Sequence, residues 1–302
     1  MVHSLAAQGE WCAKMPELPD LEYIVSALQA TVAGRPIRKV RVGDPIVLRL
    51  AVPGDLPALV TGALVRAVER RGHFVIFRLD PSYDLVVNPM LAGRFRLCAS
   101  RERTEASLRF ALEFDGALEL RYLDANRMGK AYLVLRDDWA AIPGLTTLGL
   151  DLLGGEFTLE AFQARIARRR DQVRVFLMDK TALSAIGNAY ADEILFAAGL
   201  HPKTVCARLS PDDVKTLYES IRRVIGEAIA EVRRRGEAIE EKVRDFLKVR
   251  NRKGEACPRC GTTIRVAGVR GFDSFFCPTC QPATRRPFVD WRSLPGDGRP
   301  SA

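Results

Sequence analysis

Four of the seven cysteines stand in two close pairs near the end of the chain, in the motifs CPRC and CPTC. The first pair is Cys257 and Cys260, the second is Cys277 and Cys280, and residues 261–276 separate them. Two such motifs at this separation predict a tetrahedral four-thiolate site for one Zn2+ ion. A site closed by four protein ligands is structural rather than catalytic. Two disulfides or free thiols are the alternative, and a reducing compartment disfavours the disulfides.

A Gly-Asn pair at residues 187–188 stands just before an apolar helical pattern. Backbone N–H groups at the start of such a helix can hold a phosphate, and the amide of Asn188 can add a further donor. Capping of the helix by Asn188 is the alternative, and the spacing alone favours it. Upstream, residues 167–170 and Arg174 are expected to form a basic helix face, which is either solvated or turned toward DNA.

The charge of the chain favours a polyanionic partner. Its 302 residues hold 46 Lys and Arg against 37 Asp and Glu, which gives a net charge of +9 at pH 7. This length is sufficient for two domains with sizeable cores. No apolar run reaches the roughly 18 residues that a membrane span needs, and residues 1–14 lack the basic start and apolar centre of a secretion signal. We therefore expect a nucleic-acid partner in the cytoplasm, with a basic protein of another kind as the alternative.

Helices and strands must position these residues. The hydrophobic pattern predicts a different kind of secondary structure in successive parts of the chain. A helical pattern covers residues 15–28, and residues 37–134 give mostly strand signals separated by Gly, Pro or Asp. Strands this close in sequence favour antiparallel pairing in a sandwich or barrel. After a change near residues 143–155, helices are predicted at residues 159–170, 173–178, 189–198 and 211–232, followed by a short strand-like zone at 250–281.

Four segments carry a resemblance to a known family, in that family's order. They are MPELPDLE (residues 15–22), RYLDANRMG (121–129), MDKTALSAIGNAYADEILFAAGLHP (178–202) and CPRC with CPTCQ (257–281). On these motifs the chain resembles the bacterial formamidopyrimidine-DNA glycosylase/endonuclease VIII family of base-excision repair enzymes, from residue 15 to residue 281.

The resemblance implies an α+β fold of several domains: an N-terminal antiparallel β-sandwich with a leading helix, a helix–two-turn–helix domain and a C-terminal zinc ribbon. The expected boundaries are 15–142 for the sandwich, 143–249 for the helical domain and 250–282 for the ribbon, with an extension at 1–14 and a disordered tail at 283–302. The implied partner is double-stranded DNA with damaged bases or abasic sites, bound between the lobes. We expect a monomer associated with the bacterial nucleoid.

The resemblance also implies that Pro16 and Glu17 are catalytic. A terminal proline is a secondary amine with a pKa of about 8, so its neutral fraction can attack the sugar C1′. Glu17 would serve as general acid and base, on a nucleotide flipped out of the stack. An internal Pro16 has only an amide nitrogen, so we expect translation to begin at Met15 and this methionine to be removed. The alternative is a true extension of fourteen residues on a catalytically inactive protein.

Two loops of the sandwich depart from the family's pattern. The family usually has a lysine where this chain has His73, which is expected to be partly charged at neutral pH and to support the site; a structural histidine is the alternative. The family's HLGM loop reads NPML, and its methionine fills the void left by the flipped base. Here Leu91, or neighbouring Met90, is expected to be the apolar wedge.

Two further departures from the family's pattern concern base specificity and the second elimination. One lies in the loop that faces the DNA strand opposite the damaged base, and the other lies in the zinc ribbon. In DANRMG, Asn126 replaces the arginine that usually reads the opposite base and Met128 replaces an intercalating phenylalanine; with Arg127, both are expected to contact DNA. The ribbon arginine that assists the second elimination aligns with Phe272. Arg270 lies two residues earlier, on the same face of an expected strand, and either replaces it or contacts a phosphate.

The sequence therefore favours a bifunctional DNA glycosylase and abasic-site lyase that removes oxidised or ring-opened bases and nicks the strand by β-elimination. A second hypothesis is a damaged-DNA-binding protein that keeps the zinc ribbon and the clamp without the chemistry. A zinc-ribbon transcription factor explains the cysteines but leaves PELPDLE without a role.

Overall fold

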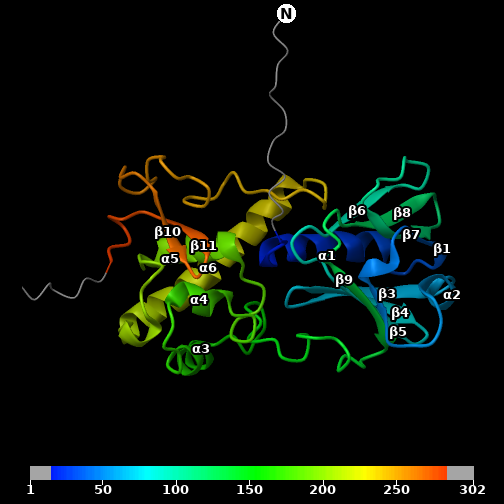
Figure 1. The fold of residues 1–302 in the computed structure, drawn as a ribbon, viewed down its shortest axis with the longest axis horizontal. Coiled ribbons are helices and arrows are strands. Elements are labelled where there is room, and N and C mark those ends of the chain that lie inside the picture. Colours follow the sequence, from blue (N-terminus) through cyan, green and yellow to red (C-terminus); the bar gives the residue numbers. More distant parts are fainter. Residues whose placement is uncertain (1–14, 284–302) are drawn as a thin grey trace, which may run out of the picture.

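A computed structural model describes residues 15–283 and shows two lobes (Figure 1). A β-sandwich lobe, coloured blue to green, lies beside a helical lobe that carries a small hairpin, β10–β11. The predicted order of leading helix, sandwich, helical domain and zinc ribbon is confirmed. The expected extension at 1–14 and nearly all of the expected tail lie outside the described residues. Within residues 15–283, none of the helices has the length and apolarity of a membrane-spanning segment.

The leading helix, α1 (Leu18–Val32), begins at a proline-rich start. Pro19 lies in its first turn, where the missing N–H is not needed, and the Glu17 backbone N–H donates to Asp20 Oδ2 over 2.8 Å. Leu21 and Leu28 recur at helical spacing and are fully buried against the sandwich. The start of α1 is thereby fixed by its own residues.

The sandwich consists of two sheets whose orders are β1-β7-β8-β6 and β2-β9-β5-β4-β3. Its elements are β1 (Ile37–Val42), η1 (Pro45–Val47), β2 (Leu48–Leu50), α2 (Leu56–Val60), β3 (Leu64–Arg71), β4 (Phe74–Asp80), β5 (Tyr83–Asn88), β6 (Arg94–Ala99), β7 (Leu108–Phe114), β8 (Leu118–Leu123) and β9 (Lys130–Leu135). The pairing is antiparallel as predicted, except that short β2 runs parallel to β9. Aromatic rings fill the space between the sheets, with Phe95 and Phe110 both packed against the ring of Tyr122.

The helical lobe contains α3 (Leu159–Ile166), α4 (Val173–Met178), α5 (Asn188–Ala198), η2 (Cys206–Arg208) and α6 (Pro211–Arg235). A capping box of Ser210 and Asp213 starts α6, and Gly236 in the left-handed conformation ends it. The first of these helices is shorter than predicted, because α3 ends at Ile166 and residues 167–170 continue without helical structure. The expectation that residues 167–170 form part of a basic helix face is therefore wrong.

The ribbon is a hairpin of β10 (Arg265–Val269) and β11 (Phe272–Phe276), which packs on α5 in the helical lobe. Val269 pairs directly with Phe272, so Arg270 and Gly271 form a two-residue turn. Both turn residues have positive φ, 46° and 80°, as a type I′ hairpin turn requires.

Each lobe contributes one apolar residue to the core of the other. Leu18, at the start of α1, is fully buried in the helical core, whereas Ile239, after α6, is buried in the sandwich core. The start of α1 and the segment after α6 therefore both help to hold the two lobes together.

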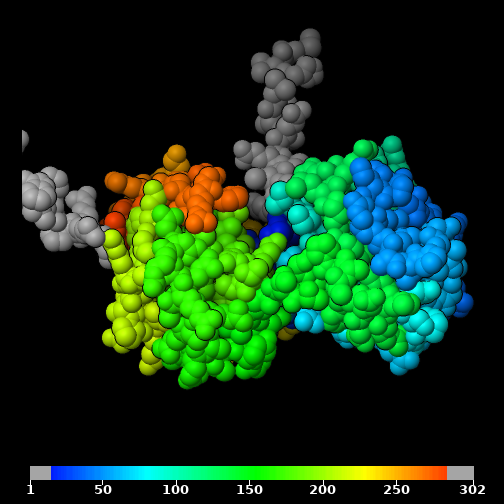
Figure 2. Space-filling view, turned by 60° about the horizontal axis from the view of Figure 1, so that its bottom comes forward, coloured from blue at the N-terminus to red at the C-terminus, as the bar shows by residue number. Residues whose placement is uncertain are grey.

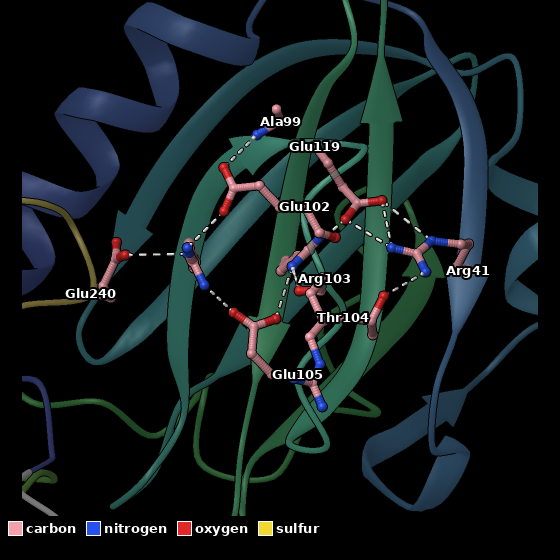
Figure 3. Close-up of polar contacts among 10 residues, drawn as sticks. Arg41, Ala99, Glu102, Arg103, Thr104, Glu105, Glu119 and Glu240 are labelled. Carbon is pink, nitrogen blue, oxygen red and sulfur yellow. Dashed lines mark hydrogen bonds and ion pairs between the residues drawn. The ribbon is translucent and has the colours of Figure 1, made fainter.

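A network of arginine and glutamate side chains covers one sheet of the sandwich (Figure 3). Arg121 is fully buried and contacts Glu119 at 2.5 Å and Glu105 at 2.9 Å. Arg96 also binds Glu105, and it reaches Glu240, which follows α6, over 3.5 Å. Because the buried charges are all paired, the network can hold the segment after α6 against the sandwich.

Candidate active site and zinc ribbon

The Glu17 carboxylate joins the two lobes. Oε2 accepts hydrogen bonds from the backbone N–H groups of Gly187 (3.0 Å) and Tyr190 (3.1 Å), and Oε1 accepts one from Ala189 (2.9 Å). These are N–H groups of the first turn of α5, which the helix itself cannot satisfy. Glu17 thus caps α5 from the other lobe, and Pro16, the residue before it, is buried. The alternative role of Asn188 as the cap of α5 is wrong, because Gly187 is the N-cap, and the contact of Asn188 with DNA stays a prediction.

Gly187 is required by this contact. A Cβ built at Gly187 would lie 2.6 Å from Cδ and 2.8 Å from Oε1 of Glu17. Real Cβ atoms do not approach so closely, and the overlap is with the carboxylate itself. Glycine is therefore needed for close approach, not for a positive φ.

Burial and charge act in opposite directions on Glu17. Burial raises the pKa of this carboxyl, while the Arg244 guanidinium and the N–H groups of α5 hold it down; the net pKa is above the ordinary value. Arg244 binds Asp20 through both nitrogens, at 2.8 Å for one of them, and lies over the Tyr190 ring at 5.2 Å. The site therefore holds a buried carboxyl that can carry a proton more readily than an exposed one.

His73 lies in the turn between β3 and β4, with 7% of its surface exposed. Burial, together with the charge of Lys180, lowers the pKa of His73 to about 3, so the ring is neutral at physiological pH. The expectation of a partly charged His73 is wrong because it used the pKa of an exposed histidine. Its supporting role in the site stays a prediction.

Lys180 did not stand out in the sequence, yet it lies at the start of the described chain. Its Nζ lies 3.8 Å from Sδ of Met15, the residue before Pro16. Burial lowers the pKa of this ammonium group. The one signal in the sequence was its place directly after Met-Asp, in the third of the four segments that carry the family resemblance.

Figure 2 shows a hollow between the lobes, with the blue start of α1 inside it and the orange zinc ribbon on its rim. Two loops of the sandwich, residues 89–93 and 124–129, lie side by side. A Cβ on Gly93 or on Gly129 would lie 2.2 or 1.9 Å from the same Tyr122 hydroxyl. Each loop presents one exposed apolar side chain, Leu91 at 41% and Met128 at 39%. Met90 is less exposed than Leu91, so Leu91 is the better wedge candidate of the two.

The fully buried side chain of Asp124 fixes the conformation of the loop at residues 124–129. Its carboxylate accepts from the N–H of Asn126 at 3.0 Å and of Gly129 at 2.7 Å. Asn126 and Arg127 are exposed, and Arg127 lies 3.2 Å from Asp44. The loop therefore offers polar side chains to solvent on a rigid base, and their DNA contacts stay predictions.

Arg174 does not lie on an exposed helix face. The expectation that it belongs to a basic surface with residues 167–170 is therefore wrong. Its side chain is 2% exposed and pairs with buried Asp192 at 3.1 Å. It also donates to Asn188 Oδ1 over 2.7 Å and to the Asp273 carbonyl over 3.2 Å. Arg174 therefore fixes the amide of half-buried Asn188 with its oxygen inward, which leaves the NH2 group for another acceptor.

The hairpin turn changes the interpretation of Arg270. Arg270 is the first turn residue and not part of β10, so the argument that it shares a strand face with Phe272 is wrong. Both side chains are nonetheless exposed at the hairpin tip, Phe272 at 54%. The tip thus offers a cation and an aromatic ring, and a DNA contact by Arg270 stays a prediction.

The four ribbon cysteines fit one zinc ion. Their Sγ atoms lie within 4.8 Å of one another, with Cys257 and Cys280 at 3.9 Å and Cys260 and Cys277 at 3.5 Å. A tetrahedron with Zn–S bonds of about 2.3 Å has edges of about 3.8 Å, so the spacing suits zinc and is too long for disulfides. All four positions are protein ligands, as a structural site requires.

Comparison with known proteins decides the family. Residues 15–131 match the formamidopyrimidine-DNA glycosylase N-terminal domain, residues 148–238 match the H2TH domain of the same glycosylase, and residues 254–283 match the zinc finger found in FPG and IleRS. The formamidopyrimidine-DNA glycosylase of Symbiobacterium thermophilum is 35% identical over 274 residues, which are 89% of this chain and 90% of the relative. This chain belongs to the formamidopyrimidine-DNA glycosylase family.

Other members of the family are similar over the same range. The formamidopyrimidine-DNA glycosylase of Geobacillus kaustophilus is 33% identical over 88% of this chain and 100% of its own. The solved structure of the MutM (FPG) protein from Thermus thermophilus is 30% identical over 88% of this chain and 98% of that chain, with a TM-score of 0.76. Lactococcus lactis Fpg, solved with DNA containing an oxidised pyrimidine, is 25% identical over 88% and 100%, with a TM-score of 0.80. With the thiolate geometry, the family match makes the four cysteines the structural zinc site of this finger.

We expect Cys277→Ala to abolish zinc binding, because a structural zinc site needs all four thiolates and the ribbon has little core of its own. The purified protein should contain one zinc per chain by elemental analysis. The variant should contain none and should bind duplex DNA more weakly, because the hairpin tip loses its support. Cys98→Ala, a buried cysteine outside the ribbon, should keep the metal. Full zinc content in Cys277→Ala would contradict the four-thiolate site.

We expect Gly187→Ala to weaken the joint between the lobes, because its Cβ would overlap the Glu17 carboxylate. Overpacking of this kind costs about 1–3 kcal/mol in the free energy of unfolding, measured by urea titration. Gly226→Ala is the matched control, since a Cβ at this position would have nothing within 4 Å and alanine favours its helix. Equal stability of the two variants would contradict the required contact.

Proposed function

We propose that this chain is a bifunctional DNA glycosylase and abasic-site lyase of base-excision repair, with Pro16 as nucleophile and Glu17 as general acid and base. One observation supports it above the others: Pro16 and Glu17 lie where the two lobes meet, and the Glu17 carboxylate is fixed by three N–H groups of α5. A dipeptide that served only to start a helix would need no such contact with the other lobe.

The chemistry begins at the Pro16 nitrogen. As a free secondary amine, it attacks C1′ of the damaged nucleotide, so an N–C1′ bond forms and the glycosidic bond breaks. The base leaves with a proton, and ring opening gives an iminium between proline and sugar. Loss of the C2′ proton then breaks the C3′–O bond, which nicks the strand by β-elimination. Water hydrolyses the iminium and returns the free amine.

Glu17 is suited to move protons in these steps. Oε2 accepts two of the three hydrogen bonds from α5 and Oε1 accepts only one, which leaves Oε1 a lone pair for the substrate. Its raised pKa favours a proton that it can give to the sugar oxygen on ring opening. The resulting carboxylate can then take the C2′ proton.

The hollow between the lobes suits a DNA duplex with one nucleotide flipped out. Leu91 and Met128 can fill the gap in the stack, and the amide of Asn188 can donate to a phosphate. Asn126 lacks the cationic fork that reads cytosine, so oxidised or ring-opened bases are proposed as substrates without a fixed cytosine partner. The solved Lactococcus lactis complex holds an oxidised pyrimidine. A cytoplasmic monomer associated with the nucleoid fits this function.

The proposed chemistry requires Pro16 to be the first residue of the mature protein. In the present sequence Met15 precedes it, and an amide nitrogen cannot attack. We propose that translation begins at Met15 and that this methionine is removed. The same observation favours one alternative function, a damaged-DNA-binding protein that keeps the clamp and zinc ribbon but cannot form the iminium.

Borohydride trapping on a duplex with one abasic site tests the proposal, since it reduces the iminium to a stable covalent adduct. Protein beginning at Pro16 should give the adduct in high yield, and the full chain of 302 residues should give none. Pro16→Gly should react poorly, and Glu17→Gln should slow the reaction about 10²- to 10⁴-fold, as loss of a general acid or base does.

Met128→Ala serves as a control that lies outside the joint between the lobes; it should bind less tightly yet still form the adduct. Failure of the Pro16 form to give any adduct, with DNA binding retained, would establish the binding protein instead.

A further inference from the structure

Lys180 is a half-buried cation beside Met15, and no ion pair balances its charge within the described residues. Within residues 15–283, its polar contact is the thioether of Met15, at 3.8 Å. No carboxylate of this part of the chain forms an ion pair with it, and burial alone accounts for its lowered pKa. In the form that begins at Pro16 this thioether contact is absent, and a partly buried ammonium group without a partner is costly unless an anion completes its environment.

The titratable groups around Pro16 and Glu17 do not supply that anion. His73 is neutral, because burial and Lys180 together bring its pKa to about 3. The Glu17 carboxylate is turned to the N–H groups of α5, and Asp20 is bound by both nitrogens of Arg244. Each acidic group around the catalytic dipeptide therefore has its own partner. No carboxylate within residues 15–283 forms an ion pair with Lys180, so a bound ligand can supply the missing anion.

The position of Lys180 indicates which ligand this is. Its Nζ lies 3.8 Å from Sδ of Met15, the residue that precedes Pro16, and its charge adds to burial in lowering the pKa of His73. In a duplex, the anion nearest to a reacting C1′ is the phosphodiester of the same nucleotide. The family resemblance implies a lysine at the position of His73, and a neutral imidazole cannot replace a fixed cation.

We propose that Lys180 binds the phosphodiester that flanks the reacting nucleotide, and that it supplies from the helical lobe the cation that His73 does not supply from the sandwich. The identity of the reacting nucleotide rests on the proposed function. Lys180 is thereby a positioning residue: it holds the sugar over Pro16 and takes no part in bond making.

Salt dependence of binding measures such a contact directly. The probe is a duplex with one tetrahydrofuran abasic analogue, which has no C1′ leaving group, titrated from low to moderate salt. Lys180→Met should weaken binding about 10- to 100-fold at low salt. It should also lower the slope of log K against log salt by about 0.9, the loss of one phosphate contact. Lys180→Arg should keep the slope, and Lys215→Met, at an exposed lysine of α6, should change neither quantity.

A variant that moves the lysine from position 180 to position 73 tests whether Lys180 replaces a cation at His73. Lys180→Met combined with His73→Lys should regain the salt slope that Lys180→Met loses, provided that circular dichroism shows both proteins folded. An unchanged slope in folded Lys180→Met would overturn the phosphate contact. A folded double variant without recovery would overturn the claim that both positions serve one anion.

The binding measurement separates this inference from the proposed function, because the tetrahydrofuran duplex cannot react. A lowered slope with no borohydride adduct in the Pro16 form would keep the Lys180 contact and reject the lyase. A full adduct yield, with the same salt slope in Lys180→Met as in the unchanged protein, would keep the lyase and reject the Lys180 contact.

Discussion

The contact on which the site depends is the capping of α5 by Glu17. Three N–H groups that would otherwise be unsatisfied at a buried helix end are paired by a carboxylate from the other lobe. The favourable interaction of a negative charge with a helix start adds to these hydrogen bonds. Because Glu17 follows Pro16 directly, the same contact fixes the proline. It also explains why Gly187 has no room for a side chain.

The surrounding structure keeps this joint rigid. Leu18 is buried in the helical core, so α1 is anchored to the lobe that it does not belong to. The segment after α6 returns to the sandwich, where Arg244 binds Asp20 and Glu240 reaches the arginine network of Figure 3. Breaking a buried pair such as that of Asp20 and Arg244 costs about 3–5 kcal/mol, far more than an exposed ion pair contributes. The start of α1, with Pro16 and Glu17 before it, is thus held from both lobes at once.

The local pattern of the sequence predicted antiparallel strands in a sandwich or barrel, the helices and the zinc ligands, since these depend on periodicity and on close cysteine spacing; the choice of a sandwich came from the family resemblance. It failed where long-range burial decides. Arg174 has the spacing of a basic face, but the ribbon and Asp192 cover it. His73 loses its charge through burial, and Arg270 lies in a turn that strand periodicity cannot reveal. The capping of α5 by Glu17 joins residues about 170 positions apart, so no local signal announced it.

The most direct test of the account is the location of the covalent bond. The Pro16 form would be trapped on an abasic duplex with borohydride, digested with protease and nuclease, and analysed by tandem mass spectrometry. We expect a reduced sugar remnant on the nitrogen of Pro16, in the peptide that contains Glu17. A remnant on Lys180 or another lysine, with the Pro16 peptide unmodified, would contradict it.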